Sequence, residues 1–165
     1  MGHLRNKLEW CLNKAKKESK THHGLKEINP NTRKANEHIE KANHNLKAMI
    51  YLIRGDLYDW AINASFYSMY HCLLAILSKY GYESRNQECT FAVIEYLIET
   101  KKLDLDLKWL RKITSSSNEP KEESIINLRE KFQYGTEAMV NETKIKQLLN
   151  DTKEFIDIVK EILKK

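Results

Sequence analysis

Three groups of polar side chains in this sequence could take part in chemistry. Arg129 and Tyr134 lie in the segment LREKFQYG, where Arg could bind a phosphate through paired hydrogen bonds and Tyr could stack on a base. His71 lies inside a long apolar segment, where an imidazole in a cleft between helices could act as a general base. Arg85 precedes Asn86 at the start of a predicted helix, where free backbone N–H groups can bind an anion.

Each group also has an ordinary structural explanation. Arg129 could pair with Glu130 or another nearby carboxylate, and Tyr134 could pack at the end of the same helix. His71 could be a core histidine that is hydrogen-bonded to a neighbouring backbone or hydroxyl group. Helix capping alone would account for the segment that contains Arg85. These alternatives remain open at the level of the sequence.

A further Arg–His pair, Arg33 and His38, lies in the basic N-terminal third. Residues five positions apart share a helix face less well than residues three or four apart. Because Lys and His are common in this region, we interpret the pair as a chance occurrence.

The sequence contains none of the familiar short motifs of catalysis or metal binding. It has no P-loop, GxGxxG, HExxH or GxSxG. Cys11, Cys72 and Cys89 form no CxxC pair, and no His lies at zinc spacing from them. We therefore expect buried thiols in a reducing cytoplasmic environment rather than a disulfide framework, and we predict no metal and no organic cofactor.

The elements that must position these side chains are predicted to be helices. The chain has 165 residues, of which 41% are hydrophobic and 31% charged, so it fits one domain that is neither disordered nor embedded in a membrane. Five Gly and two Pro provide few turns, which argues against a sandwich, a barrel or an α/β sheet. The predicted fold class is all-α, as one domain over residues 1–165 with 1–28 as an N-terminal helical extension.

Apolar spacing predicts helices along most of the chain and no strand. The expected helices are 2–20, one that begins at Pro30 and ends at Gly55, 57–79, one that carries Phe91 to Ile98, a short one within 103–113, 120–134 and 141–165, with a loop at 115–120. Four of these helices have recognisable start signals. The predicted caps are Asn29 before Pro30, Asp56, a capping box over Ser84–Gln87, and Asn141.

The predicted helix over 57–79 is apolar or aromatic on nearly all sides. Trp60 to Ser78 has no charged residue, but five polar side chains within it favour a buried helix over a membrane span. Such a helix is either central in the bundle or partly a subunit contact. The first ten residues contain no apolar run, so we expect no signal peptide.

The charge of the chain is concentrated in its first third. Residues 1–54 contain twelve Lys and Arg against five Asp and Glu, whereas the whole chain has a formal net charge of +5. This basic region could contact phosphates. The alternative is a solvated helix face that is rich in Lys.

Several segments resemble HEPN domains. Residues 60–83, WAINASFYSMYHCLLAILSKYGYE, are similar to the signature helix of that family, in which aromatic, small and Met or His residues precede a turn that ends in Gly. LREKFQYG, residues 128–135, resembles the Arg-containing motif late in the fold, and 141–165 resembles its C-terminal helix. The resemblance covers roughly residues 33–165.

The resemblance implies an up-and-down antiparallel bundle, here of about five to six helices, that forms a homodimer. Many HEPN proteins are metal-independent ribonucleases, and many of these are toxins that pair with a small nucleotidyltransferase antitoxin. Their active motif is Arg, four to six other residues, then His, and both subunits contribute to the cleft. Other members have lost this motif and act as modules that bind RNA, nucleotides or proteins.

The family motif carries over to this chain only in part. Arg129 matches the motif's Arg, but Tyr134 stands five residues later and no His follows, the last being His71. A phenol with a reference pKa near ~10 is a poor general base at neutral pH. The resemblance therefore implies that Arg129 holds a phosphate and lines the cleft with Tyr134, with His71 and Arg85 as further candidates. Arg129, Tyr134 and His71 are the candidates for catalysis, and binding is favoured over catalysis.

Three functions follow as hypotheses. The first is a cytoplasmic homodimer that binds RNA or a nucleotide and belongs to a toxin–antitoxin or nucleotidyltransferase pair. The second is a metal-independent endoribonuclease toxin with a remodelled site. The third is a protein-interaction module that binds no nucleic acid. None of the three requires a membrane.

Overall fold

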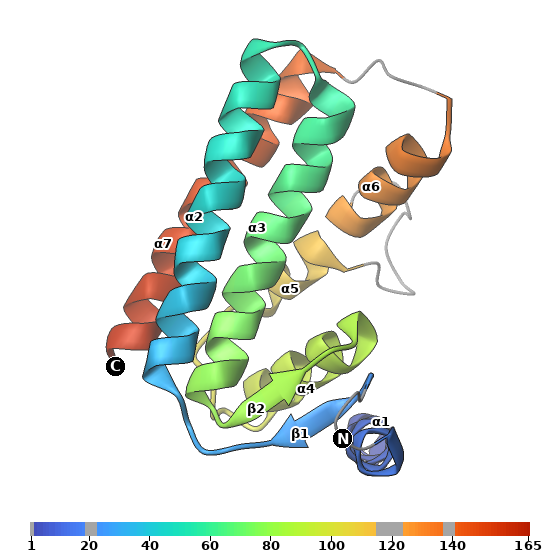
Figure 1. The fold of residues 1–165 in the computed structure, drawn as a ribbon, viewed down its shortest axis with the longest axis vertical. Helices are drawn as coiled ribbons and strands as arrows, with labels where there is room; N and C mark the ends of the chain where they lie inside the picture. The colour runs from blue at the N-terminus through green and yellow to red at the C-terminus, as the bar shows by residue number, and fades with distance from the viewer. Residues whose placement is uncertain (1, 19–22, 115–123, 137–140) are drawn as a thin grey trace.

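The computed structural model describes residues 2–18, 23–114, 124–136 and 141–165 (Figure 1). The described part of the chain is helical apart from one pair of short strands, which confirms the all-α fold class. In chain order the elements are α1 (Gly2–Glu18), β1 (Leu25–Glu27), α2 (Thr32–Arg54), α3 (Tyr58–Lys79), β2 (Tyr82–Ser84), α4 (Gln87–Glu99), α5 (Leu107–Ile113), α6 (Ile125–Tyr134) and α7 (Glu142–Lys164).

The long hairpin of α2 and α3 forms the centre of the bundle (Figure 1). The two helices run antiparallel, and α7 packs against both. Small side chains on α3 allow this close approach: the Ser68 hydroxyl donates to the Ala42 carbonyl oxygen at 2.8 Å, and Ser65 lies 2.8 Å from the Thr152 hydroxyl of α7. These buried hydroxyls are satisfied by a partner helix, as the interior requires.

The second and last helices follow the amphipathic pattern of the sequence. The buried side of α2 contains Ala35, Ile39, Ala42 and Met49, which recur at the predicted spacing of four and three residues. The last helix begins where predicted, because the Asn141 side chain accepts a hydrogen bond from the Thr143 N–H. At its other end, the Lys79 ammonium donates to the carbonyl oxygens of Ile162 and Leu163 at 3.0 Å each.

Three of the predicted helix starts are wrong by a few residues. Asn31, not Asn29, caps α2, since its side chain accepts from the Lys34 N–H. No side chain caps α3, which follows Leu57 instead of Asp56. Asn86 caps α4, in place of the predicted capping box. In each case several neighbouring polar residues can cap, and the path of the preceding chain decides between them.

The prediction that the chain contains no strand is wrong. β1 and β2 pair antiparallel, with Leu25 opposite Ser84. Three residues are too few to show an alternating pattern, so the signal in the sequence is only Gly81, whose φ of +81° reverses the chain after α3. The Ile28 N–H donates to the Gly81 carbonyl oxygen at 2.9 Å, and this contact extends the pairing.

The prediction of free thiols throughout is also wrong. Cys11 of α1 and Cys89 of α4 form a disulfide across 78 residues of sequence, with Cα atoms 5.7 Å apart. Such long-range proximity leaves no trace in local spacing. Cys72 is the buried free thiol, and burial raises its pKa. Gly24 allows the chain before β1 to approach α1 closely. A side chain at this position would not fit, because its Cβ atom would lie 2.6 Å from the Cys11 carbonyl oxygen.

One side of α3 remains exposed, although the helix is otherwise buried. Trp60 and Tyr67, two turns apart, are 59% and 44% exposed, and Ala64 lies between them at intermediate burial. Of the two predicted roles for this helix, the central position is confirmed, because α3 packs against α2, α4, α6 and α7. The subunit contact stays a prediction. In the described part of the chain, no helix combines the length and apolar character needed to cross a membrane. The loop predicted at 115–120 and the start of the helix predicted at 120 lie outside the described residues.

Candidate functional site

Helix α6 turns Arg129 toward the interior of the bundle. Ser124 caps this helix by accepting a hydrogen bond from the Asn127 N–H, and Ile125 and Leu128 form its buried side. Arg129 follows directly and is also buried, with only 9% of the residue exposed. Lys and Arg are rarely buried to this degree without a partner.

The Arg129 guanidinium lies over an aromatic ring of α3. Its central carbon is 4.4 Å from the centre of the Phe66 ring, which places the charge on the negative face of the π system. Phe66 is fully buried and is fixed by stacking on Tyr70 at 5.8 Å and by an edge contact with Tyr67 at 5.3 Å. The cation therefore packs on a ring that is itself held by two further aromatic contacts.

Arg129 has no anionic partner within the described residues. Its Nε atom is buried and makes no hydrogen bond there, and Glu130 is exposed on another side of the helix. The surface Arg–Glu pair considered from the sequence is therefore absent from this part of the chain. A charged side chain that is only 9% exposed, with a buried Nε that has no partner in the described residues, loses hydration. Its guanidinium would gain from an anion that reaches it.

Tyr134 lies apart from Arg129. The phenol is 76% exposed at the last residue of α6, and a separation of five residues places it on a different side of the helix. No hydrogen bond or ring contact joins the two side chains within the described residues. Tyr134 is thus accessible to a ligand at the surface, and it does not pack at the helix end.

His71 pairs with His38 of α2. Their Nδ1 atoms are 3.1 Å apart, so one neutral ring donates and the other accepts. Burial lowers the pKa of His38 to about 4, with contributions from His71 and Lys34, and burial also lowers the pKa of His71. The predicted core histidine is thus half-buried, and its partner is a second imidazole instead of a backbone or hydroxyl group.

Arg85 and Arg33 are surface residues with nearby carboxylates. Arg85 lies 3.1 Å from Glu83, and both residues follow the C-terminal end of α3. The end of α3 is about 20 Å along the helix from Phe66. Arg33 lies 3.3 Å from Glu37 and pairs with that carboxylate instead of with His38. The structure therefore distributes the predicted residues over separate regions. Among them, only Arg129 lies at an interior position without a counter-ion in the described residues.

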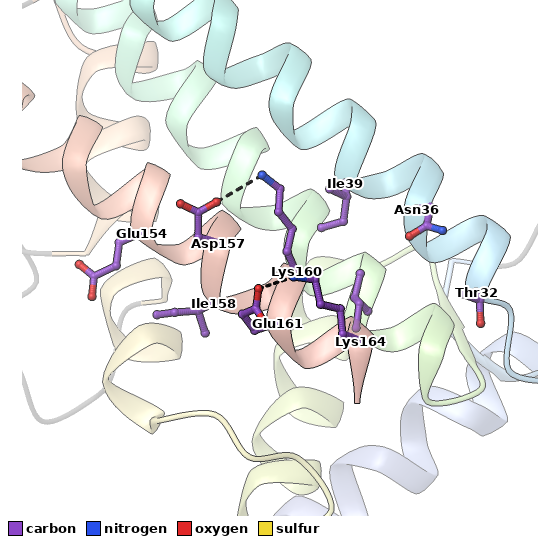
Figure 2. Close-up of a pocket in the computed structure, with 10 residues that line it drawn as sticks. Thr32, Asn36, Ile39, Glu154, Asp157, Ile158, Lys160, Glu161 and Lys164 are labelled. Atoms are coloured by element: carbon purple, nitrogen blue, oxygen red, sulfur yellow. Dashed lines mark hydrogen bonds and ion pairs between the residues drawn. The ribbon is translucent and has the colours of Figure 1, made fainter.

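The cavity beside α7 and α2 does not suit a phosphate ligand. It has a volume of about 860 Å³ between α2 and the C-terminal half of α7 (Figure 2). Its lysines are already neutralised, because Lys160 lies 3.2 Å from Asp157 and Lys164 lies 2.6 Å from Glu161. Glu154 adds a further negative charge, so this groove would repel a polyanion.

Two residues of these contacts were missed by sequence reasoning, namely Phe66 and His38. Phe66 is one of many aromatic residues in an apolar helix, and nothing local distinguishes the ring that supports a cation. The sequence relates His38 only to Arg33, by a spacing that we interpret as chance, whereas its actual partner is 33 residues away. Only the packing of α2 and α6 on α3 reveals both contacts.

Comparison with known proteins identifies a family. The family model described as the HEPN domain matches residues 35–162, a range that begins in α2 and ends in α7. The matched range excludes α1 and β1. Among curated proteins, none matches the chain significantly.

Proposed function

Because the chain belongs to the HEPN domain family, we propose that it binds RNA or a nucleotide through a phosphate contact at Arg129. The observation that carries this proposal is the largely buried Arg129, whose guanidinium lies over Phe66 and whose Nε has no partner in the described residues. A phosphate that approached this side chain would supply the missing charge and accept paired hydrogen bonds.

The other candidate residues have supporting roles in this proposal. Tyr134 is exposed and offers a ring on which a base could stack. Arg85, with its neighbouring Glu83 carboxylate, would add only a peripheral contact that is sensitive to salt.

Binding is favoured over cleavage because no general base lies beside Arg129 in the described residues. His71 is hydrogen-bonded to His38 on the side of α3 that faces α2, whereas Arg129 packs on Phe66, five residues earlier in the helix. A helix rotates through 100° per residue, so His71 and Phe66 project in different directions. Cleavage would require a base from elsewhere, such as a second subunit.

We further propose that the protein is a homodimer and one member of a pair with a small nucleotidyltransferase. The exposed stripe Trp60–Ala64–Tyr67 on α3 supports the dimer, because exposed aromatic side chains in a row are typical of interfaces. The nucleotidyltransferase partner is supported by the family resemblance alone. Co-expression with the product of a neighbouring nucleotidyltransferase gene, followed by purification through a tag on one protein, tests that pairing.

The central experiment measures RNA binding and RNA cleavage separately. Fluorescence anisotropy with a labelled single-stranded RNA at several salt concentrations gives the affinity, and gel analysis in EDTA detects metal-independent cleavage. We expect Arg129→Met to weaken binding about tenfold or more and to reduce the salt slope by about 0.7. Arg54→Gln removes an exposed arginine at the end of α2 and serves as the control.

The outcomes separate the three hypotheses. Loss of binding in Arg129→Met alone supports a phosphate site at Arg129. Cleavage in EDTA that Arg129→Met abolishes would establish a ribonuclease with a remodelled site. If neither the wild-type protein nor the variants bind RNA or nucleotides, the protein is an interaction module and the proposal fails.

A further inference from the structure

A second cavity, distinct from the Arg129 position, is lined by a cluster of cations. It has a volume of about 540 Å³ and lies between α5, the first turn of α6 and the N-terminal half of α7. Lys108, Arg111 and Lys112 of α5 and Lys144 of α7 line it, against a single carboxylate, Asp151. A concave site with this excess of positive charge concentrates anions.

Only part of this charge is neutralised within the protein. Lys112 lies 2.8 Å from Asp151, and Lys108 lies 3.7 Å from Asp106 outside the cavity. Within the described residues, Arg111 and Lys144 have neither an ion pair nor a hydrogen bond. Two cations on different helices therefore line the cavity with unused hydrogen-bond donors.

The lysines of α5 are held in place by an aromatic ring. The ammonium groups of Lys108 and Lys112 lie 5.7 and 5.0 Å from the centre of the Trp109 ring, and Trp109 itself is buried and stacked on Phe155 at 5.4 Å. Cation–π contacts of this kind restrict the flexible lysine chains. Restricted donors lose less entropy when they bind a ligand.

The rest of the cavity wall combines a buried hydroxyl with apolar side chains. Ser124 is 6% exposed, and its oxygen accepts from the Asn127 N–H, so its own proton is available to an acceptor in the cavity. Gln147 and the apolar residues Ile125, Leu128 and Leu148 complete the wall. A ligand that fits has a strongly anionic part and an apolar or aromatic part.

We propose that this cavity binds a di- or triphosphate group, with Arg111 and Lys144 as its main contacts and Lys108 and Ser124 as additional donors. The apolar wall of Ile125, Leu128 and Leu148 favours a nucleoside polyphosphate over inorganic polyphosphate, because it offers a surface to a sugar and a base. The site is separate from the one proposed at Arg129, whose side chain packs on α3 and does not line this cavity.

The test compares two ligands that share the phosphate chemistry. Isothermal titration calorimetry of the full chain with ATP and with inorganic triphosphate, in buffer without divalent ions, measures both affinities. We expect ATP to bind more tightly than triphosphate, and Arg111→Gln/Lys144→Gln to weaken both ligands by about tenfold or more. Arg54→Gln/Lys153→Gln removes the same charge from exposed positions outside the cavity and should leave both affinities within about twofold of wild type.

Further variants distinguish this site from the RNA site. Leu148→Gln should weaken ATP but not triphosphate, since Leu148 lies in the apolar part of the wall. Leu148 is also a core residue that is 6% exposed, so thermal unfolding of each variant checks its folding. Arg129→Met should leave unchanged the ATP binding that Arg111→Gln/Lys144→Gln removes, whether or not a nucleotide also binds at Arg129. Failure of RNA binding at Arg129 therefore does not affect this test. The proposal is overturned if neither ligand binds at millimolar concentration, or if the two double variants weaken binding equally. Equal affinity for ATP and triphosphate would overturn the nucleoside preference.

Discussion

The guanidinium of Arg129 loses part of its hydration in the folded protein, and the protein offsets only part of that loss. The Phe66 ring returns part of the hydration energy that the cation loses, but no carboxylate shares the site within the described residues. An arrangement of this kind stabilises a bound anion more than it stabilises the free protein. The residue therefore combines a small contribution to folding with a large potential contribution to binding.

Replacement of Arg129 by an apolar residue of similar length tests this balance. We expect Arg129→Met to change the free energy of unfolding by no more than about 1 kcal/mol, because the lost cation–π contact is offset by the relief of a buried charge. Urea denaturation at neutral pH measures the change. A destabilisation of about 3 kcal/mol or more would show instead that Arg129 is part of a structural network.

The pair of His38 and His71 makes stability depend on pH. Because the pKa of His38 is lowered from 6.5 to about 4 in the folded protein, the unfolded chain binds a proton between these pH values that the native ring does not bind. Stability is therefore fully present above pH 6.5 and is lost as the pH falls toward 4. Because both rings are partly exposed, we expect a loss on the order of 1 kcal/mol, which is below the full linkage value.

Urea denaturation at pH 7 and pH 5 measures this dependence. His38→Gln removes the imidazole with the lowered pKa, so its stability should change less with pH than that of the wild type. His44→Gln replaces an exposed histidine on the same helix and should behave like the wild type. A pH dependence that persists in His38→Gln would assign the effect to other groups.

Helix α1 is joined to the central hairpin indirectly, through its neighbours. It packs mainly against α4 and β1 instead of the α2–α3 hairpin, and it lies outside the residues that match the family. The Cys11–Cys89 disulfide and the ion pair of Lys7 with Glu88 at 2.8 Å tie it to α4. The exposed ion pair adds little, so the disulfide and the buried side chains Leu8 and Ala15 are what hold this helix.

Reduction of the disulfide should loosen α1 while α2, α3 and α7 stay folded. We expect Cys11→Ser/Cys89→Ser to lower the free energy of unfolding by about 2–4 kcal/mol and to accelerate amide hydrogen exchange in α1. Exchange measured by mass spectrometry, with and without reductant, reports on each helix.

The control for this experiment is Lys7→Gln, which breaks the ion pair with Glu88 and leaves the disulfide in place. Its exchange in α1 should stay close to that of the wild type, because an exposed ion pair contributes little. Cys72→Ser is unsuitable as a control, since that thiol is buried in the core. Equal exchange in α1 before and after reduction would contradict the prediction.

At the scale of the whole molecule, the bundle leaves one aromatic stripe uncovered. The small residues of α3 that face α2 and α7 are buried, whereas Trp60 and Tyr67 on its remaining side are exposed. A second copy that packed against this stripe would remove both aromatic rings from water. The proposed homodimer is therefore best placed on this side of α3.

Light scattering across micromolar concentrations tests the dimer. We expect the wild-type protein to have twice the mass of one chain, and Trp60→Glu/Tyr67→Glu to be monomeric because two charges would be buried at the contact. Tyr51→Glu, which changes an exposed aromatic residue on α2, is the control and should remain dimeric. A monomeric wild type would rule out a cleft shared by two subunits.

The helical class, the extent of the long helices and the family could all be predicted from the amino-acid sequence. Apolar residues recur at helical spacing in α2 and α7, and Asn141 and Gly135 lie at helix ends. These signals depend only on residues close in the sequence, so they can be recognised without the fold. The HEPN family, which segments 60–83 and 128–135 indicated, is confirmed by the family match over residues 35–162. The sequence did not show which of several neighbouring polar residues caps α2, α3 or α4, because that depends on the path of the chain before each helix.

The contacts between side chains of different helices could not be predicted from the sequence. Arg129 on Phe66, His38 beside His71 and Cys11 bonded to Cys89 each join residues from different helices. The two strands likewise form only because α3 returns the chain beside β1. Contacts of this kind depend on how amphipathic helices pack against one another. The periodicity of a sequence shows which face of a helix is buried, but it does not show which helix that face contacts.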